Sequence, residues 1–109
     1  MAPVLSPAAR GLLRALTLRS GVTRDRILLS QWTSVDWQSL TFLGERHQAE
    51  FRITGTDAAA VAARIANGLT DAEFAIPGQI VADIALVGRP HVASDGATVV
   101  RIEALTIAE

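Results

Sequence analysis

The chain of 109 residues contains no cysteine, no tyrosine and no lysine. Without cysteine it forms no disulfide, thiolate zinc site or iron–sulfur cluster, and it has no cysteine nucleophile. Without lysine it lacks the residue that Schiff-base chemistry and phosphate-binding Walker loops require. Without tyrosine it also lacks a phenolic general acid. These absences exclude several large classes of enzyme mechanism.

Recognisable catalytic motifs are equally scarce. The chain has no G-x-G-x-x-G, G-x-x-x-x-G-K-[ST], G-x-S-x-G or H-E-x-x-H sequence. Its two histidines, His47 and His91, lie too far apart along the chain to form a local metal-ligand motif. We therefore assign no catalytic residue and no metal ligand, and we expect no cofactor.

Half of the residues are hydrophobic and 19% are charged, a composition that is typical of a folded globular protein. The length fits one domain over residues 1–109. No apolar run approaches the ~18–20 residues that a membrane-spanning helix needs, so we expect no membrane association. Arginines interrupt the N-terminal apolar stretch, which does not resemble a secretory signal, and we expect a cytoplasmic protein.

The net charge of −1 conceals an uneven distribution along the chain. Residues 1–26 carry five arginines and only one acidic residue, whereas residues 27–109 carry five arginines and ten acidic residues. We interpret residues 1–24 as a basic N-terminal helix packed on or beside the rest of the fold, or against a partner. Nucleic-acid binding is not expected, because these arginines are spaced singly and no aromatic residue precedes Trp32.

Two segments have the signals of helices. Ser6-Pro7 is a good N-terminal cap for a helix over residues 7–19, which Ser20-Gly21 would end. Asp57 is expected to cap a second helix that runs to about Asn67, where Gly68 would close it.

Residues 26–54 alternate between apolar and polar side chains, which predicts β-strands. We expect three strands here, with tight turns at Ser34-Val35 and at Gly44-Glu45. In this register Trp32 lies opposite Trp37, and Trp37 lies opposite Arg52. Two further strands are predicted over residues 79–88 and 98–108, with a turn around Ser94-Asp95-Gly96 between them.

The predicted fold class is therefore α+β: a two-layer sandwich of an antiparallel sheet with about five strands and two helices, in the order α-β-β-β-α-β-β. The second helix is expected to cover the apolar side of the sheet. The first helix has three alternative positions: the other side of the sheet, the sheet edge, or a neighbouring subunit.

The predicted register places Trp32, Trp37 and Arg52 together on the less apolar side of the sheet. Tryptophan and arginine are enriched at binding hot spots, so this cluster is the candidate partner- or ligand-binding surface. It is alternatively ordinary core beneath the first helix. Our leading hypothesis is a non-catalytic protein-interaction or assembly module that binds a second copy of itself, as a homo-oligomer, or another protein.

The alternative hypothesis is a binding domain for a small anionic ligand, or a cofactor-free enzyme, that uses the same side of the sheet. The two tryptophans would form apolar walls and Arg52 would bind the anionic group. Glu50 or Asp83 would then be the general base. Cross-strand ion pairs are the simpler interpretation of the carboxylates Glu50, Asp83 and Glu103.

Overall fold

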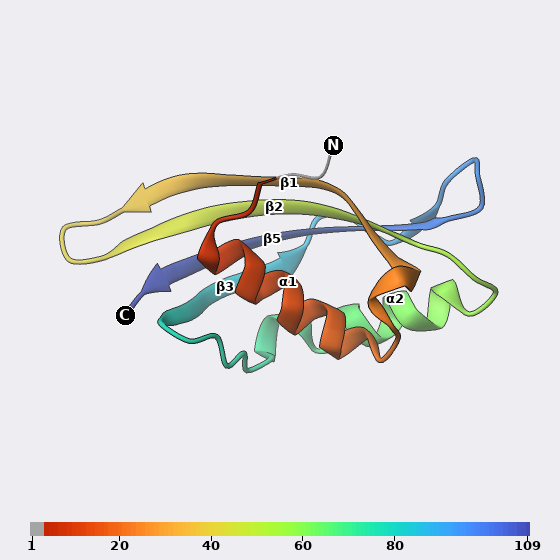
Figure 1. Ribbon diagram of the computed structural model, residues 1–109, viewed down its shortest axis with the longest axis horizontal. Coiled ribbons are helices and arrows are strands. Elements are labelled where there is room, and N and C mark those ends of the chain that lie inside the picture. Colours follow the sequence, from red (N-terminus) through yellow and green to blue (C-terminus); the bar gives the residue numbers. More distant parts are fainter. Residues whose placement is uncertain (1–3) are drawn as a thin grey trace.

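A computed structural model, which describes residues 4–109, shows one antiparallel sheet and two helices in two layers (Figure 1). This confirms the predicted α+β class. Short 3₁₀ turns stand at Arg24–Arg26 and Leu69–Asp71. The helices are α1 (Pro7–Ser20) and α2 (Ala58–Ala66), and the strands are β1 (Ile27–Gln38), β2 (Leu43–Ile53), β3 (Gln79–Leu86), β4 (His91–Val92) and β5 (Thr98–Ala108).

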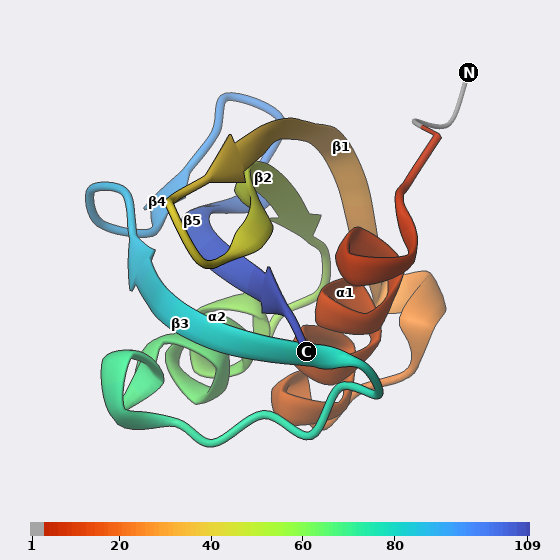
Figure 2. The same cartoon turned by 90° about the vertical axis from the view of Figure 1, so that its left-hand side faces the viewer.

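The strands follow the spatial order β1-β2-β5-β3, and the short β4 pairs with the beginning of β5. The sheet is curved, and both helices lie on its concave side (Figure 2). Their apolar residues join one core with side chains from a single face of the sheet. The first helix thus lies beside the second, and neither helix covers the convex face, which we call the uncovered face.

The boundaries of α1 follow from its sequence. The Ser6 hydroxyl accepts a hydrogen bond from the backbone N–H of Ala9 at 3.1 Å, and Pro7 occupies the first turn. Gly21 ends the helix in the left-handed conformation, with φ of 75°. The same Ser6 hydroxyl donates to the carboxylate of Glu45 at 2.9 Å, which ties the start of α1 to β2.

Two arginines join the C-terminal ends of the helices. The Arg19 guanidinium, on α1, donates to the backbone oxygens of Ile65 and Asn67 at the end of α2. In return, Arg64 of α2 donates to the backbone oxygen of Ser20 at 2.7 Å. Each helix therefore satisfies terminal carbonyl groups of the other and supplies a favourable positive charge at that end.

Strand β5 and the turn before it follow the prediction. Strand β5 has the expected bounds, and Asp95 stabilises the preceding turn by accepting a hydrogen bond from the backbone N–H of Ala97. Strand β3 ends at Leu86, two residues earlier than predicted. Asp57 precedes α2, but its carboxylate pairs with Arg26 and makes no capping hydrogen bond.

The prediction of three strands over residues 26–54 was wrong. This region is one hairpin of two long strands, and Ser34-Val35 lies inside β1. The turn occupies residues 39–42, where the Ser39 hydroxyl accepts the N–H of Phe42 at 3.1 Å. The order of helices and strands along the chain is consequently α-β-β-α-β-β-β. The short strand β4, which was not predicted, brings the number of strands to five.

Gly44 explains the misplaced turn. It lies inside β2, between Trp37 of β1 and Ile107 of β5, and not at a bend. A β-carbon at this position would collide with the backbone oxygen of Thr106. The glycine is therefore required by a close approach of two backbones, for which glycine is as suitable as it is for a turn.

Candidate functional site

The structure separates the three residues of the predicted cluster. Trp32 points into the core and is 8% exposed, whereas Trp37 lies on the uncovered face. Arg52 lies on that face too, but it is eight residues from Gly44, the partner of Trp37, which corresponds to about 26 Å along β2. The predicted juxtaposition of Trp32, Trp37 and Arg52 was therefore wrong. Trp32 is instead a core residue, which was the alternative interpretation of the cluster from the sequence.

Trp32 belongs to a buried polar network. Its indole N–H donates to the Ser34 hydroxyl at 3.0 Å, and that hydroxyl lies 2.8 Å from Nδ1 of His47. On the other side of the ring, Nε2 lies 2.8 Å from the hydroxyl of Thr106. The indole N–H, which can only donate, also points at Nδ1 at 3.4 Å, so Nδ1 is an acceptor; Ser34 then donates to Nδ1, and Nε2–H donates to Thr106.

This arrangement favours a neutral imidazole. His47 is 2% exposed, and burial lowers its pKa below the ordinary value of 6.5. Although a serine hydroxyl contacts an imidazole here, the concavity that His47 helps to line measures only about 100 Å³, well below the ~300–1,000 Å³ of small-molecule sites. We interpret Ser34, His47 and Thr106 as a satisfied structural network.

The uncovered face has an apolar end. Trp37, Gly44, Ile107 and Ile80 form one row across the four long strands, from β1 to β3. Val35 and Leu105 stand in the next row. We call five of these side chains the apolar patch: Val35, Trp37, Ile80, Leu105 and Ile107. The adjoining hairpin turn projects beyond the helices (Figure 1) and adds exposed Leu40 and Phe42.

The middle of the uncovered face is charged and internally paired. Arg101 donates to Glu50 at 2.9 Å, and the Ser30 hydroxyl donates to the same carboxylate at 2.7 Å. The Ser30 and Arg101 hydrogen bonds together hold the pKa of Glu50 below its ordinary value. At the far end Arg52 pairs with Asp95. The ion-pair interpretation of Glu50 is thus supported, and Arg52 is already engaged by a carboxylate.

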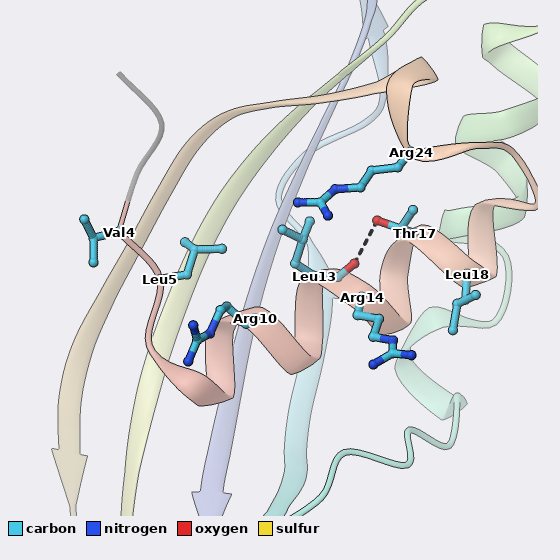
Figure 3. A pocket seen from close by; sticks show the side chains of 8 residues that line it. All are labelled: Val4, Leu5, Arg10, Leu13, Arg14, Thr17, Leu18 and Arg24. Atoms are coloured by element: carbon cyan, nitrogen blue, oxygen red, sulfur yellow. Dashed lines mark hydrogen bonds between the residues drawn. The ribbon is translucent and has the colours of Figure 1, made fainter.

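A concavity of about 260 Å³ lies in this charged region, between Gln31, Glu50, Val87 and Arg101. A larger groove of about 600 Å³ lies on the helical layer instead, along the outer side of α1 (Figure 3). We call it the α1 groove. It is lined by Val4, Leu5, Arg10, Leu13, Arg14, Thr17, Leu18 and Arg24.

The α1 groove combines positive charge with apolar side chains. Five of its residues, at positions 10, 13, 14, 17 and 18, lie on one helical face at the spacing i, i+3, i+4, i+7, i+8. Arg24 extends toward Leu13 from the segment before β1 (Figure 3). Arg10, Arg14 and Arg24, the groove arginines, are three cations with no carboxylate in the lining.

The arginines of the first 26 residues therefore differ in role. Arg19 and Arg26 bind backbone oxygens or a carboxylate of the fold. The guanidinium groups of the groove arginines form no hydrogen bond or ion pair with any residue from 4 to 109. Sequence analysis identified the excess positive charge but not this groove, because only the fold brings Arg24 beside α1.

The chain matches no model of a known protein family and no curated protein. Within residues 4–109, no group of three or more histidine or acidic side chains is placed to hold a metal ion. In the same range no helix combines the length and the apolar character needed to cross a membrane.

Proposed function

We propose that this protein is a non-catalytic assembly module that forms a homodimer through the apolar patch on its uncovered sheet face. The observation that carries the proposal is a set of five large apolar side chains at one end of a sheet face that neither helix covers. Val35 is 59% exposed and Ile80 is 51% exposed. Exposed patches of this kind, rimmed by polar residues, are typical of protein-interaction sites.

The exposed area of the chain supports a partner of this size. A compact monomer of 11.5 kDa exposes about 5,800 Å² by the scaling of surface with mass, whereas this chain exposes 6852 Å². The surplus of roughly 1,000 Å² exceeds the ~800 Å² that each partner buries in an interface of standard size.

Charge favours a second copy as the partner. Arg46 and Asp83 stand in the same cross-sheet row, on either side of Leu105, and neither forms an ion pair within residues 4–109. In a two-fold interface, residue i of one copy meets residue j of the other, and j meets i. Two copies packed face to face can therefore pair each Arg46 with the Asp83 of the other copy.

Light scattering during size exclusion, over a range of protein concentrations, tests this proposal. We expect a mass of two subunits that shifts toward 11.5 kDa on dilution. Trp37→Ala should give the monomer mass at concentrations where the wild type is dimeric. Leu28→Ala is the matched control, because Leu28 is a 61% exposed residue at the opposite end of the same face.

A charge swap distinguishes this interface from general hydrophobic association. Arg46→Asp alone and Asp83→Arg alone should each weaken the dimer, and the double variant should restore it. A wild-type mass of one subunit at every concentration would overturn the proposal. Equal effects of the Trp37 and Leu28 variants would reject the assigned surface.

The alternative of an anionic-ligand site on this face is less well supported. Arg52, the expected anion contact, is paired with Asp95, and Trp37 lines neither the concavity at Glu50 nor a smaller one of about 100 Å³ between Arg46, Asp83 and Glu103. The hydrogen bonds from Ser30 and Arg101 hold the pKa of Glu50 below its ordinary value, which makes Glu50 a weaker base, and Asp83 lines only the smaller concavity. We therefore place anion binding elsewhere in the molecule.

A further inference from the structure

We propose that the α1 groove binds an amphipathic organic anion, with a carboxylate or phosphate head at the groove arginines and a hydrocarbon body against the leucines of α1. This site is separate from the apolar patch, since it lies on the helical layer and not on the uncovered face. The inference does not depend on the proposed dimer.

The charge of the groove points to an anion. Three arginines line one concavity whose lining contains no acidic residue. Elsewhere in the chain Arg26, Arg52 and Arg101 each pair with a carboxylate. Guanidinium groups bind carboxylates and phosphates through paired, charge-assisted hydrogen bonds. An anionic head group would therefore provide hydrogen-bond acceptors for the groove arginines.

The apolar lining indicates that the ligand is more than an inorganic ion. Leu18 is 74% exposed, and Leu5 and Leu13 are only partly buried against the core. A hydrocarbon body lying on these side chains would be removed from water together with them. Inorganic phosphate would occupy the arginines and leave this apolar surface exposed.

The construction of α1 distinguishes the groove from an ordinary solvated helix surface. One face of the helix buries Leu12 and Leu16 in the core, and the adjacent face carries the groove residues. The Thr17 hydroxyl donates to the backbone oxygen of Leu13 at 2.9 Å, so it is turned toward the helix (Figure 3). The volume of about 600 Å³ falls within the ~300–1,000 Å³ range of small-molecule sites.

The shape and composition of the groove favour a discrete small molecule over a nucleic acid or a membrane surface. The groove contains no aromatic side chain on which a nucleic-acid base could stack. Its leucines line a concavity between the helix and Arg24, whereas a helix that lies on a bilayer presents a convex apolar face. A membrane surface is therefore the competing occupant that the experiment must distinguish.

Isothermal titration calorimetry with decanoate and decyl phosphate, each below its critical micelle concentration, tests the proposal on the wild-type chain. We expect at least one of them to bind, and inorganic phosphate to bind about tenfold more weakly or not at all. Decyltrimethylammonium, which has the same tail and the opposite charge, should not bind. Chemical-shift changes of backbone amides should concentrate at residues 10–18 and 24.

Variants locate the charge that matters. Arg10→Gln combined with Arg14→Gln should weaken binding by about tenfold or more, and Arg24→Gln by about threefold or more. Arg89→Gln is the matched control, since Arg89 is an exposed arginine outside the groove, and it should change the affinity by less than about twofold.

Four results would overturn the proposal. These are the absence of binding by both anions, equal binding of the cationic amphiphile, and an equal loss of affinity in Arg89→Gln and the groove variants. The fourth is binding only to vesicles that contain phosphatidylglycerol, which would show a membrane surface and not a ligand site. Because the shift mapping uses the unaltered protein, it remains decisive even if a variant is poorly folded.

Discussion

The two faces of the sheet are made from the same strands but have different relations to the rest of the chain. The covered face buries Phe51, Ile53 and Trp32, and its polar members Ser34, His47 and Thr106 satisfy one another. Among residues 4–109, no buried side-chain polar atom lacks a hydrogen-bond partner. The uncovered face instead ends in an apolar patch for which the described fold supplies no cover.

This difference separates side chains that the fold requires from side chains that it does not use. Residues of the covered face are explained by burial, packing and hydrogen bonding within the chain. Val35 and Ile80 gain little from the fold, because more than half of each residue remains in water, and Trp37 beside them is only partly buried. A partner molecule would explain these side chains, as a ligand would explain the groove arginines.

The largest expected effect is a contrast in stability between the faces. Phe51→Ala should lower the free energy of unfolding by about 3–5 kcal/mol, because it opens a cavity in the core. Val35→Ala, on the uncovered face, should lower it by less than about 0.5 kcal/mol. Urea denaturation at dilutions where the chain is monomeric measures both values. Similar losses in the two variants would show that the faces do not differ as described.

A second prediction concerns the pH dependence of the covered face. Because the pKa of His47 is lowered in the folded state, the unfolded chain binds a proton below pH 6.5 that the folded chain does not. Stability should therefore be complete above this pH and fall by up to about 1.4 kcal/mol per pH unit below it, until the folded pKa is reached.

Urea denaturation between pH 8 and pH 5 measures this loss, which precedes the carboxylate titrations at lower pH. His91→Gln is the control, since His91 is exposed on β4 and its replacement should leave the dependence intact. The assignment to His47 would fail if the stability were constant over this range, or if His91→Gln abolished the loss.

The smallest expected effect lies in the charged middle of the uncovered face. Arg101→Gln removes the ion pair with Glu50, in which the arginine side chain is 57% exposed, and should cost less than about 1 kcal/mol. The loss should shrink in 1 M salt, where exposed charges are screened. A loss above 2 kcal/mol would mean that this region contributes to stability as the core does.

Local signals in the sequence were sufficient for part of the fold. Ser6-Pro7 and Gly21 determine both ends of α1 through the backbone groups that they satisfy or the conformation that they allow. The alternation of apolar and polar residues in β2 likewise agrees with the burial of His47 and Phe51 on one face. These features depend on neighbours in sequence, which a single chain displays directly.

The hairpin and the candidate surfaces depend on contacts between distant residues. Trp32 and Trp37 are five positions apart, so they face opposite sides of one continuous strand, and only a turn between them would have brought them to one side. The apolar spacing is compatible with both arrangements. Likewise, the helical spacing of Arg10 and Arg14 is visible in the sequence, whereas the position of Arg24 beside this face of α1 is not.

The exchange of arginines between the helix ends has a consequence for motion. If α1 frays at its C-terminus, Arg19 releases the carbonyls of α2, and fraying of α2 withdraws Arg64 from Ser20 in the same way. Local opening of one helix end therefore exposes unsatisfied groups on both. This reciprocity makes the helical layer a cooperative unit, in which the α1 groove keeps its shape only as long as both helix ends stay closed.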